Sequence, residues 1–287
     1  MKFLHFLADD GVHLGVGEDS WVADITAADG SLASVDQLLE APEDGMLHIR
    51  SLLKTAPRAQ EACLRYAPCL LRPEKIVCVG LNYGGHAAEF AMERPVHPVL
   101  FSKFGNALAA HRQDIPVSPY AQQLDYEAEL VIVMGRECRD VTEDQALSYV
   151  FGYTVGNDLS ERKAQFESGQ WLAGKSWDYF APIGPGIVPA TDIDPHGLEI
   201  ACRVNGEIRQ KDNTRRMLFS CEAIVAYISR TITLRPGDLI FTGTPEGVMM
   251  GRPESEQRWL RPGDRVAVTI EGIGTLENRF VPFARES

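Results

Sequence analysis

Residues 124–135, with the sequence LDYEAELVIVMG, determine how the rest of this 287-residue chain is organised. Leu, Val, Ile and Met form a hydrophobic run that ends at Gly135, and this pattern predicts a β-strand. Because side chains alternate along a strand, Glu127 and Glu129 are expected on one face, followed there by two valines. The other face is also apolar, so we expect a strand that is buried on both sides.

The two glutamates lie side by side at the start of this strand, where they repel each other and lose hydration. A divalent cation with oxygen ligands would remove both costs. The alternative is a solvated strand end at which Glu127 and Glu129 pair with Lys or Arg. Glutamate pairs with this spacing are common in proteins, so the spacing alone leaves both interpretations open.

The composition is that of an ordinary globular protein, with 45% hydrophobic and 24% charged residues. The formal net charge of −12 disfavours a nucleic-acid or anionic-membrane partner. The six cysteines form no C-x-x-C pair and no zinc-binding spacing, which is typical of reduced core residues. No segment resembles a signal peptide, and the apolar runs are too short to span a membrane. These features together predict a cytoplasmic protein.

Residues 1–70 are expected to form a small N-terminal α+β domain, and residues 71–287 a larger catalytic domain. Arg72-Pro73 marks the boundary, because the strand-like run at 76–80 that opens the larger part follows it directly. We find no chemically suggestive residues in the first part.

Within residues 1–70, a hairpin and a helical region are predicted. The strand-like runs at 2–7 and 12–16 are joined at Asp9-Asp10-Gly11, which is a turn signal. Residues 35–66 then show a helical pattern that two prolines interrupt.

A possible catalytic pair follows the strand at 76–80. The paired glycines at 84–85 permit a tight turn, and a short helix is expected after them. On such a helix His86 and Glu89 share a face. A carboxylate beside an imidazole orients the ring and raises its basicity, which suits a general base acting on water. The alternative is an exposed helix pair, which is the usual meaning of an isolated H-x-x-E.

A further acidic residue follows the strand predicted at 150–157. Asp158 could cap the next helix, with Glu161 at its third helical position. It could instead provide a third oxygen ligand beside the two glutamates of the central strand. Arg162 and Gln165 would then lie on the first turns of the helix that follows.

The remaining motifs are turn-rich. Lys175 stands between glycine and serine, where a lysine is normally a surface residue, and only proximity to a metal would make it a substrate contact. Asn205-Gly206 predicts a type I′ hairpin. Residues 242–248 lack the Gly-Lys-Ser/Thr ending of a P-loop, so nucleotide binding is not expected. A threonine beside Gly243 could instead offer its hydroxyl and backbone N–H to a carboxylate.

Six segments, taken in order, resemble the fumarylacetoacetate hydrolase superfamily in its smaller bacterial and acylpyruvase-like branch. They are KIVCVGLNYGGHAAEF, LDYEAELVIVMG, GYTVGNDLSER, GKSWDYFAPIGP, VNGEIRQ and TGTPEGV. Each is weak alone, but six in register over residues 75–280 are specific. The resemblance implies an α+β fold with a mixed β-sheet roll or barrel, a small N-terminal domain and, usually, a homodimer. The chain departs from the family pattern at 103–106, and at Trp177 and Tyr179.

The resemblance also implies a set of functional residues. It implies one Mg²⁺ or Mn²⁺ held by Glu127, Glu129 and Asp158. It implies three catalytic residues. His86 and Glu89 form a dyad on a lid that closes over substrate, and Lys175 is the third. It implies three substrate contacts: Arg162, Gln165 and Thr244.

The reaction implied is hydrolysis of a C–C bond in an acylpyruvate or related 2,4-dioxo acid. A 2-oxo acid can chelate the metal through its carboxylate and keto oxygens, and the metal and Lys175 would stabilise the enolate released. Decarboxylation of oxaloacetate, or isomerisation of a 2-hydroxyhepta-2,4-diene-1,7-dioate or carboxymethyl-hydroxymuconate type of substrate, would use the same enolate. A metal-binding module without turnover and a nucleotide-dependent enzyme are the alternatives from other classes.

Overall fold

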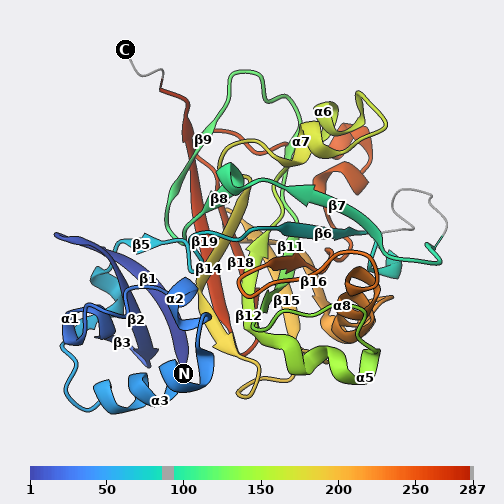
Figure 1. The fold of residues 1–287 in the computed structure, drawn as a ribbon. Coiled ribbons are helices and arrows are strands. Elements are labelled where there is room, and N and C mark those ends of the chain that lie inside the picture. Colours follow the sequence, from blue (N-terminus) through green and yellow to red (C-terminus); the bar gives the residue numbers. More distant parts are fainter. Residues whose placement is uncertain (86–93, 285–287) are drawn as a thin grey trace.

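The computed structural model describes residues 1–85 and 94–284, and it is an α+β structure in which strands predominate (Figure 1). One large sheet has the strand order β4-β3-β2-β1-β14-β12-β11-β17-β6-β7. A second sheet has the order β16-β15-β18-β19-β9. The α+β class expected from the sequence is therefore confirmed.

The N-terminal residues form one end of the large sheet. Its strands are β1 (Lys2–Ala8), β2 (Gly11–Glu18), β3 (Trp21–Asp24), β4 (Arg58–Gln60) and β5 (Tyr66–Ala67). The helices beside them are α1 (Ile25–Ala28), α2 (Val35–Leu38) and α3 (Pro42–Leu52). The hairpin predicted at residues 9–11 is confirmed, because β1 and β2 pair antiparallel on either side of it.

The helical pattern predicted over 35–66 is only partly right. Pro42 occupies the first turn of α3, where its missing N–H costs nothing, so it starts a helix instead of breaking one. Beyond Leu52 the prediction is wrong, since β4 and β5 pair with the edges of the N-terminal strands. β1 also pairs with β14 at Phe3 and Ile187, which continues the large sheet across the expected boundary. The division near residue 70 stays a prediction.

The central strands of the large sheet carry the site. They are β6 (Ile76–Gly80), β7 (Val99–Lys103), β8 (Leu108–Ala109), β11 (Ala128–Met134), β12 (Val150–Asn157), β14 (Ala181–Pro189) and β17 (Leu239–Phe241). β17 pairs parallel with β6 and antiparallel with β11, so the sheet is mixed. Every residue of β11 is buried, which confirms the expectation of a strand covered on both sides.

The strand predicted at 124–135 is broken in two. β10 (Leu124–Asp125) pairs with β13 (Ser160–Glu161), and two residues outside any strand follow before β11 begins at Ala128. Glu127 therefore lies just before the strand, while Glu129 lies within it.

The second sheet and the remaining helices complete the fold. Its strands are β9 (Asp114–Val117), β15 (Glu199–Val204), β16 (Glu207–Asn213), β18 (Arg265–Ile270) and β19 (Gly274–Pro282). The further helices are α5 (Glu143–Ala146), α6 (Arg162–Phe166), α7 (Leu172–Lys175) and α8 (Cys221–Ser229). Single 3₁₀ turns lie at Glu61–Cys63, Gly105–Ala107, Leu147–Tyr149, Thr214–Arg216, Met249–Gly251 and Glu254–Glu256.

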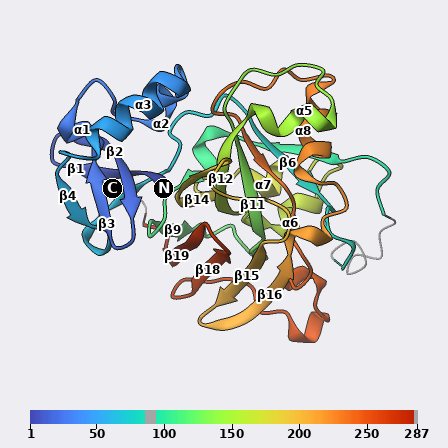
Figure 2. The same cartoon turned by 90° about the horizontal axis from the view of Figure 1, so that it is seen from below.

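Two views show how these parts surround the central strands. Viewed from below, the N-terminal strands stand to one side, and α5 and α8 lie together away from them (Figure 2). Asn205 and Gly206 both have positive φ, as the predicted type I′ hairpin between β15 and β16 requires. In the described ranges, no helix has the length and apolar character needed to cross a membrane.

Candidate metal centre and substrate pocket

Three carboxylates meet where β11 begins and β12 ends. Ligand oxygens of Glu127, Glu129 and Asp158 lie within 4.8 Å of one another, and all three residues are buried. The register brings them together, because Ala128 pairs with Asn157 at this end of the two strands. The Asn157 side chain accepts the Glu127 N–H at 3.0 Å, and the Asp158 N–H donates to the Glu127 carbonyl at 2.9 Å.

Three cationic side chains neutralise part of this charge. The Lys175 ammonium lies 2.7 Å from Glu127 Oε2 and 2.8 Å from Asp158 Oδ2. Lys103 Nζ is 2.7 Å from Asp158 Oδ1. Arg162 Nη2 is 2.7 Å from Glu127 Oε1. All of the cations are themselves buried, so each ion pair is shielded from water.

Glu129 differs from its two neighbours. It accepts the Gly243 N–H at 2.7 Å, but among the described residues it forms no ion pair with a Lys or Arg. Burial, followed by repulsion from Asp158 and Glu127, raises the pKa of Glu129 well above its usual range. A divalent cation would remove this repulsion, and an all-carboxylate oxygen set suits Mg²⁺ or Mn²⁺. The residues present therefore fit the predicted metal.

Lys103 is a buried residue of the site that the sequence did not reveal. Its ammonium donates to the carbonyls of Leu159 at 3.0 Å and Phe180 at 2.8 Å, and also to that of Lys175. Burial lowers the pKa of Lys103, although Asp158 opposes this effect. Lys103 thus ties the backbone at Lys175 to Asp158. A lysine that ends a strand carries no local signal of such a role.

Arg162 is held by several acceptors. Its Nε lies 3.0 Å from Asp125 Oδ2, and its Nη1 donates to the Gln165 amide oxygen at 2.9 Å. Asp125 in turn accepts the backbone N–H groups of Met249 and Met250 at 2.9 and 3.0 Å. Arg162 therefore links Glu127, through Asp125, to the segment at Met249 and Met250, and its predicted contact with substrate stays a prediction.

The helix cap after β12 is not Asp158. The residue that precedes α6 is Glu161, whose carboxylate accepts the Ala164 N–H at 2.7 Å. The alternative interpretation of Asp158 as the cap is wrong. The chain forms a short strand, β13, between Asp158 and the helix, and this leaves the Asp158 carboxylate to face the two lysines.

Gln210 is a second residue that sequence reasoning missed as part of the site. Its amide oxygen accepts the Ala128 N–H at 3.0 Å, and its amide nitrogen donates to Thr244 Oγ1 and the Pro245 carbonyl, both at 2.8 Å. It therefore orients the Thr244 hydroxyl and connects β16 to the start of β11. The segment VNGEIRQ that contains it carries part of the family resemblance, but its pattern assigns no role to Gln210.

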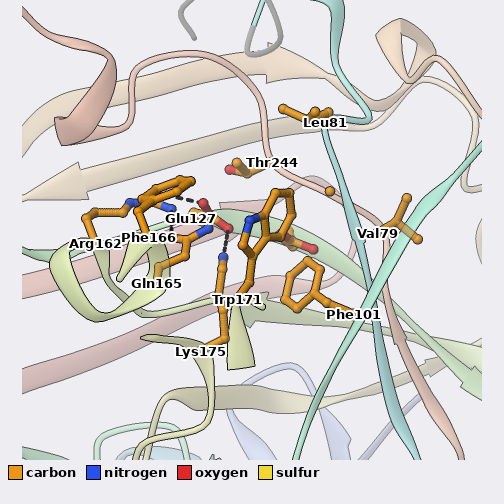
Figure 3. A pocket seen from close by; sticks show the side chains of 12 residues that line it. Val79, Leu81, Phe101, Glu127, Arg162, Gln165, Phe166, Trp171, Lys175 and Thr244 are labelled. Atoms are coloured by element: carbon orange, nitrogen blue, oxygen red, sulfur yellow. Dashed lines mark hydrogen bonds and ion pairs between the residues drawn. The ribbon is translucent and has the colours of Figure 1, made fainter. Parts of the chain in front are cut away.

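The predicted residues line one narrow pocket (Figure 3). Its polar side is formed by Glu127, Glu129, Arg162, Gln165, Lys175 and Thr244. Its other side is apolar, and the cavity volume is about 30 Å³. His86 and Glu89 lie outside the described residues. The structure thus brings together the described members of the predicted set, with Asp158 in direct contact with the Lys175 ammonium.

Comparisons with known proteins agree with this geometry. The family model described as fumarylacetoacetate (FAA) hydrolase C-terminal matches residues 75–281. The oxaloacetate tautomerase FAHD2A of Bos taurus, named as mitochondrial, is 38% identical over 98% of this chain and 92% of its own. The solved fumarylacetoacetate hydrolase from Exiguobacterium antarcticum is 36% identical and superimposes with a TM-score of 0.87, over 99% of this chain and 100% of that one.

A solved relative contains ligands. The maleylpyruvate hydrolase from Sphingobium sp. SYK-6, in complex with a manganese(II) ion and pyruvate, is 29% identical and has a TM-score of 0.83. It covers 99% of this chain and 100% of that one. The likeness in sequence and fold confirms the family that the six segments predicted.

Proposed function

This chain belongs to the fumarylacetoacetate hydrolase family, and we propose that it is a Mg²⁺- or Mn²⁺-dependent enzyme that interconverts the keto and enol forms of oxaloacetate or a similar short 2-oxo acid. One observation carries the proposal. Glu129 is buried beside Glu127 and Asp158 without a cationic partner among the described residues, in a pocket that also holds the Lys175 ammonium.

The electrostatics favour an anionic substrate once a divalent ion is bound. Without it, the triad and Asp125 provide four carboxylates against three cations, Lys103, Lys175 and Arg162. Glu127, Glu129 and Asp158 would hold the Mg²⁺ or Mn²⁺, which would supply a Lewis acid for the keto oxygen of the substrate. The ion would also reverse the sign of the net charge, so that a carboxylate is attracted.

Lys175 stabilises negative charge on the substrate. Two of its three N–H donors are used by Glu127 and Asp158, which leaves one for a ligand in the pocket. Burial alone would lower the pKa of Lys175, but the two carboxylates outweigh it and raise the pKa. The side chain therefore stays protonated, and it acts as a charge stabiliser instead of a base. Removal of the C–H proton falls to another group, and His86 assisted by Glu89 is the predicted one.

Hydrolysis of a C–C bond in an acylpyruvate is the second candidate. The complex of the Sphingobium maleylpyruvate hydrolase with manganese and pyruvate favours it, because pyruvate is the product that such a cleavage would release. In this reaction His86 would instead activate water. Oxaloacetate decarboxylation and isomerisation of an unsaturated oxo-diacid share the enol chemistry and belong in the same assays. A homodimer and a cytoplasmic location stay predictions.

The test compares these reactions in one preparation. Keto–enol exchange and decarboxylation of oxaloacetate, and cleavage of acetylpyruvate, are measured with wild type, Lys175→Met and His86→Ala at saturating Mg²⁺ or Mn²⁺. We expect Lys175→Met to impair every reaction that the wild type catalyses. His86→Ala should reduce cleavage by about 10²–10⁴-fold, the usual value of a general base. Full activity in excess EDTA would refute the metal requirement, and no acceleration of keto–enol exchange would refute the tautomerase proposal.

A further inference from the structure

We propose that Trp171 is a specificity-determining residue, whose indole ring closes the apolar side of the pocket and limits the length of the substrate beyond its 2-oxo acid group. This inference rests on the proposed function. It names the substrate class more closely: short 2-oxo acids, with longer chains excluded by one side chain.

Trp171 is held against the pocket by its neighbours. Its ring lies edge-on to Phe101 at 5.3 Å and to Phe166 at 6.5 Å between ring centroids. In the close view, the indole lies between the Glu127–Lys175 pair and the apolar side chains of Phe101 and Val79 (Figure 3). It therefore faces the path of any substrate arm that extends away from the carboxylates.

Gly80 makes room for the indole. A Cβ atom at Gly80 would lie 2.5 Å from Trp171 Cζ3 and 3.0 Å from Cη2, which is far closer than carbon atoms approach. The next nearest atom, Phe101 Cε1, would be at an ordinary 3.8 Å. The glycine at the end of β6 thus allows the Trp171 indole to pack directly against the backbone of Gly80. The ring position is set from two sides, by Gly80 and by the aromatic pair.

The position of Trp171 in the chain links the indole to Lys175 on the polar side of the pocket. Trp171 immediately precedes α7, and Lys175 is the last residue of that helix, four residues later. Residues with this spacing share a helix face, so both side chains reach the same pocket. This short helix therefore positions both the Lys175 ammonium, which contacts the 2-oxo acid group, and the Trp171 indole, which limits the length of the remaining substrate arm.

The size of the cavity supports a length limit. The space inside is about 30 Å³, and Trp171 is among the residues that line it, so the indole occupies room that a longer substrate arm would need. The surfaces around Trp171 are apolar, and Val79, Leu81 and Phe101 would contact such an arm. Removal of the indole should therefore admit longer alkyl arms, and each newly buried methylene should improve binding by about fourfold.

The experiment measures binding, so that it does not depend on turnover. Oxamate carries the carboxylate and adjacent carbonyl of a 2-oxo acid, and its N-alkyl derivatives lengthen the arm in steps. Dissociation constants for oxamate and for N-methyl, N-propyl and N-pentyl oxamate are measured by calorimetry with saturating Mn²⁺. For wild type we expect affinity to fall beyond the methyl derivative. For Trp171→Ala it should rise with each added methylene, while oxamate itself binds within a few-fold of wild type.

Two further variants serve as controls. Trp177→Ala removes the same side chain two residues beyond α7, where the indole stacks on Phe180 and lines a different surface groove. Its length dependence should match wild type. Gly80→Ala should alter the length dependence by displacing the indole, but it should have no effect in the Trp171→Ala background, where its clashing partner is gone.

The outcomes separate the two proposals. If oxamate binds to wild type and the length dependence of Trp171→Ala equals that of wild type, the inference about Trp171 is overturned and the proposed function stands. If oxamate fails to bind to wild type with either metal, the recognition of 2-oxo acids is overturned, and the inference with it. Independent effects of Gly80→Ala and Trp171→Ala would also contradict the inference, because they would mean that Gly80 does not position the indole.

Discussion

Asp125 and Glu129 are four residues apart and equally buried, yet their surroundings differ completely. Asp125 receives the Arg162 guanidinium and three backbone N–H groups, those of Tyr126, Met249 and Met250. Glu129 receives one backbone N–H group, and in the described part of the chain no cation pairs with it. One carboxylate is fully satisfied by the protein, and the other is not.

The difference separates a structural acid from a ligand. Desolvation of a carboxylate is costly. A buried carboxylate that has no function is therefore expected to be paired with a cation or replaced by another residue. Asp125 gains a connection between β10, α6 and the loop at Met249. The described residues do not compensate the Glu129 carboxylate with a cation, and this is expected if a metal ion binds there. Four predictions test this distinction, in order of decreasing effect.

The largest effect is expected for Asp158, which belongs with Glu129 in the triad. Asp158→Asn keeps the size of the side chain but removes one ligand charge. A metal ion contributes several kcal/mol of charge stabilisation, and each 1.36 kcal/mol is a factor of ten in rate. We expect kcat/KM to fall at least about 10³-fold while the far-ultraviolet circular dichroism is retained. The exposed Asp192 is the control, and Asp192→Asn should keep full activity. Equal activity of Asp158→Asn and wild type would remove Asp158 from the metal site.

The next effect concerns the stability of the structural acid. Asp125→Asn would leave the buried Arg162 with less charge compensation and place an N–H donor against backbone donors. Breaking a buried ion pair in this way typically costs about 3–5 kcal/mol. Urea unfolding in EDTA should show a loss of this size in the free energy of unfolding. A loss below about 1 kcal/mol would mean that Asp125 is not the structural residue that its contacts indicate.

A smaller effect is expected for Glu161, the acid that caps α6. Its two carboxylate oxygens accept the N–H groups of Gln122, Gln123 and Ala164. Loss of an N-cap costs about 0.5–2 kcal/mol, so Glu161→Ala should lower the unfolding free energy by that amount. At saturating metal and at a temperature well below unfolding, its kcat should stay within a few-fold of wild type. A loss of activity as large as that of Asp158→Asn would contradict the assignment of the cap to Glu161 and of the ligand to Asp158.

Much of this site was predictable from the sequence, but not the distinction between its acids. The resemblance of the six segments to the family implied the triad, whereas the spacing of Glu127, Glu129 and Asp158 alone left their role open. The cap could not be assigned to Glu161, because Asp158 is the residue type that caps prefer and β13, which consists of Ser160 and Glu161, gives no hydrophobic signal. Lys103 and Gln210 were missed as site residues because their roles depend on contacts 72 and 82 residues away along the chain.

The same limit explains the errors in the fold. The pattern over 35–66 is helical apart from its two prolines, so periodicity alone could not show that the chain changes from α3 to the short edge strand β4. The unbroken hydrophobic run after Glu129 identified β11, but not the break before it, where the Glu127 N–H donates to the side chain of Asn157, 30 residues away. Local pattern specifies which residues are buried, and long-range contacts specify what each buried polar group meets.

The smallest change in stability, and the sharpest test of the comparison, is expected for Glu129→Gln. The amide oxygen can still accept the Gly243 N–H, so the variant loses only the charge. In EDTA at pH 7 we expect its unfolding free energy to be up to about 1 kcal/mol above that of wild type, because the amide avoids the cost of burying an unpaired carboxyl group at this pH. Asp125→Asn should do the opposite, although both changes replace a buried carboxylate with an amide.

The unfolding free energies of wild type and Glu129→Gln should also depend differently on pH and on metal. Because the pKa of Glu129 is raised in the folded protein, the unfolded chain releases that proton first as pH increases. The contribution of Glu129 to stability therefore falls as pH rises above about 4.5, towards its folded pKa, and Glu129→Gln should lack this fall. Mn²⁺ at 100 times its dissociation constant should stabilise wild type by about 2.7 kcal/mol, and the variant by much less. A metal-free Glu129→Gln protein that is less stable than wild type at pH 7 would show that the protein itself compensates this charge, and that Glu129, like Asp125, is a structural acid.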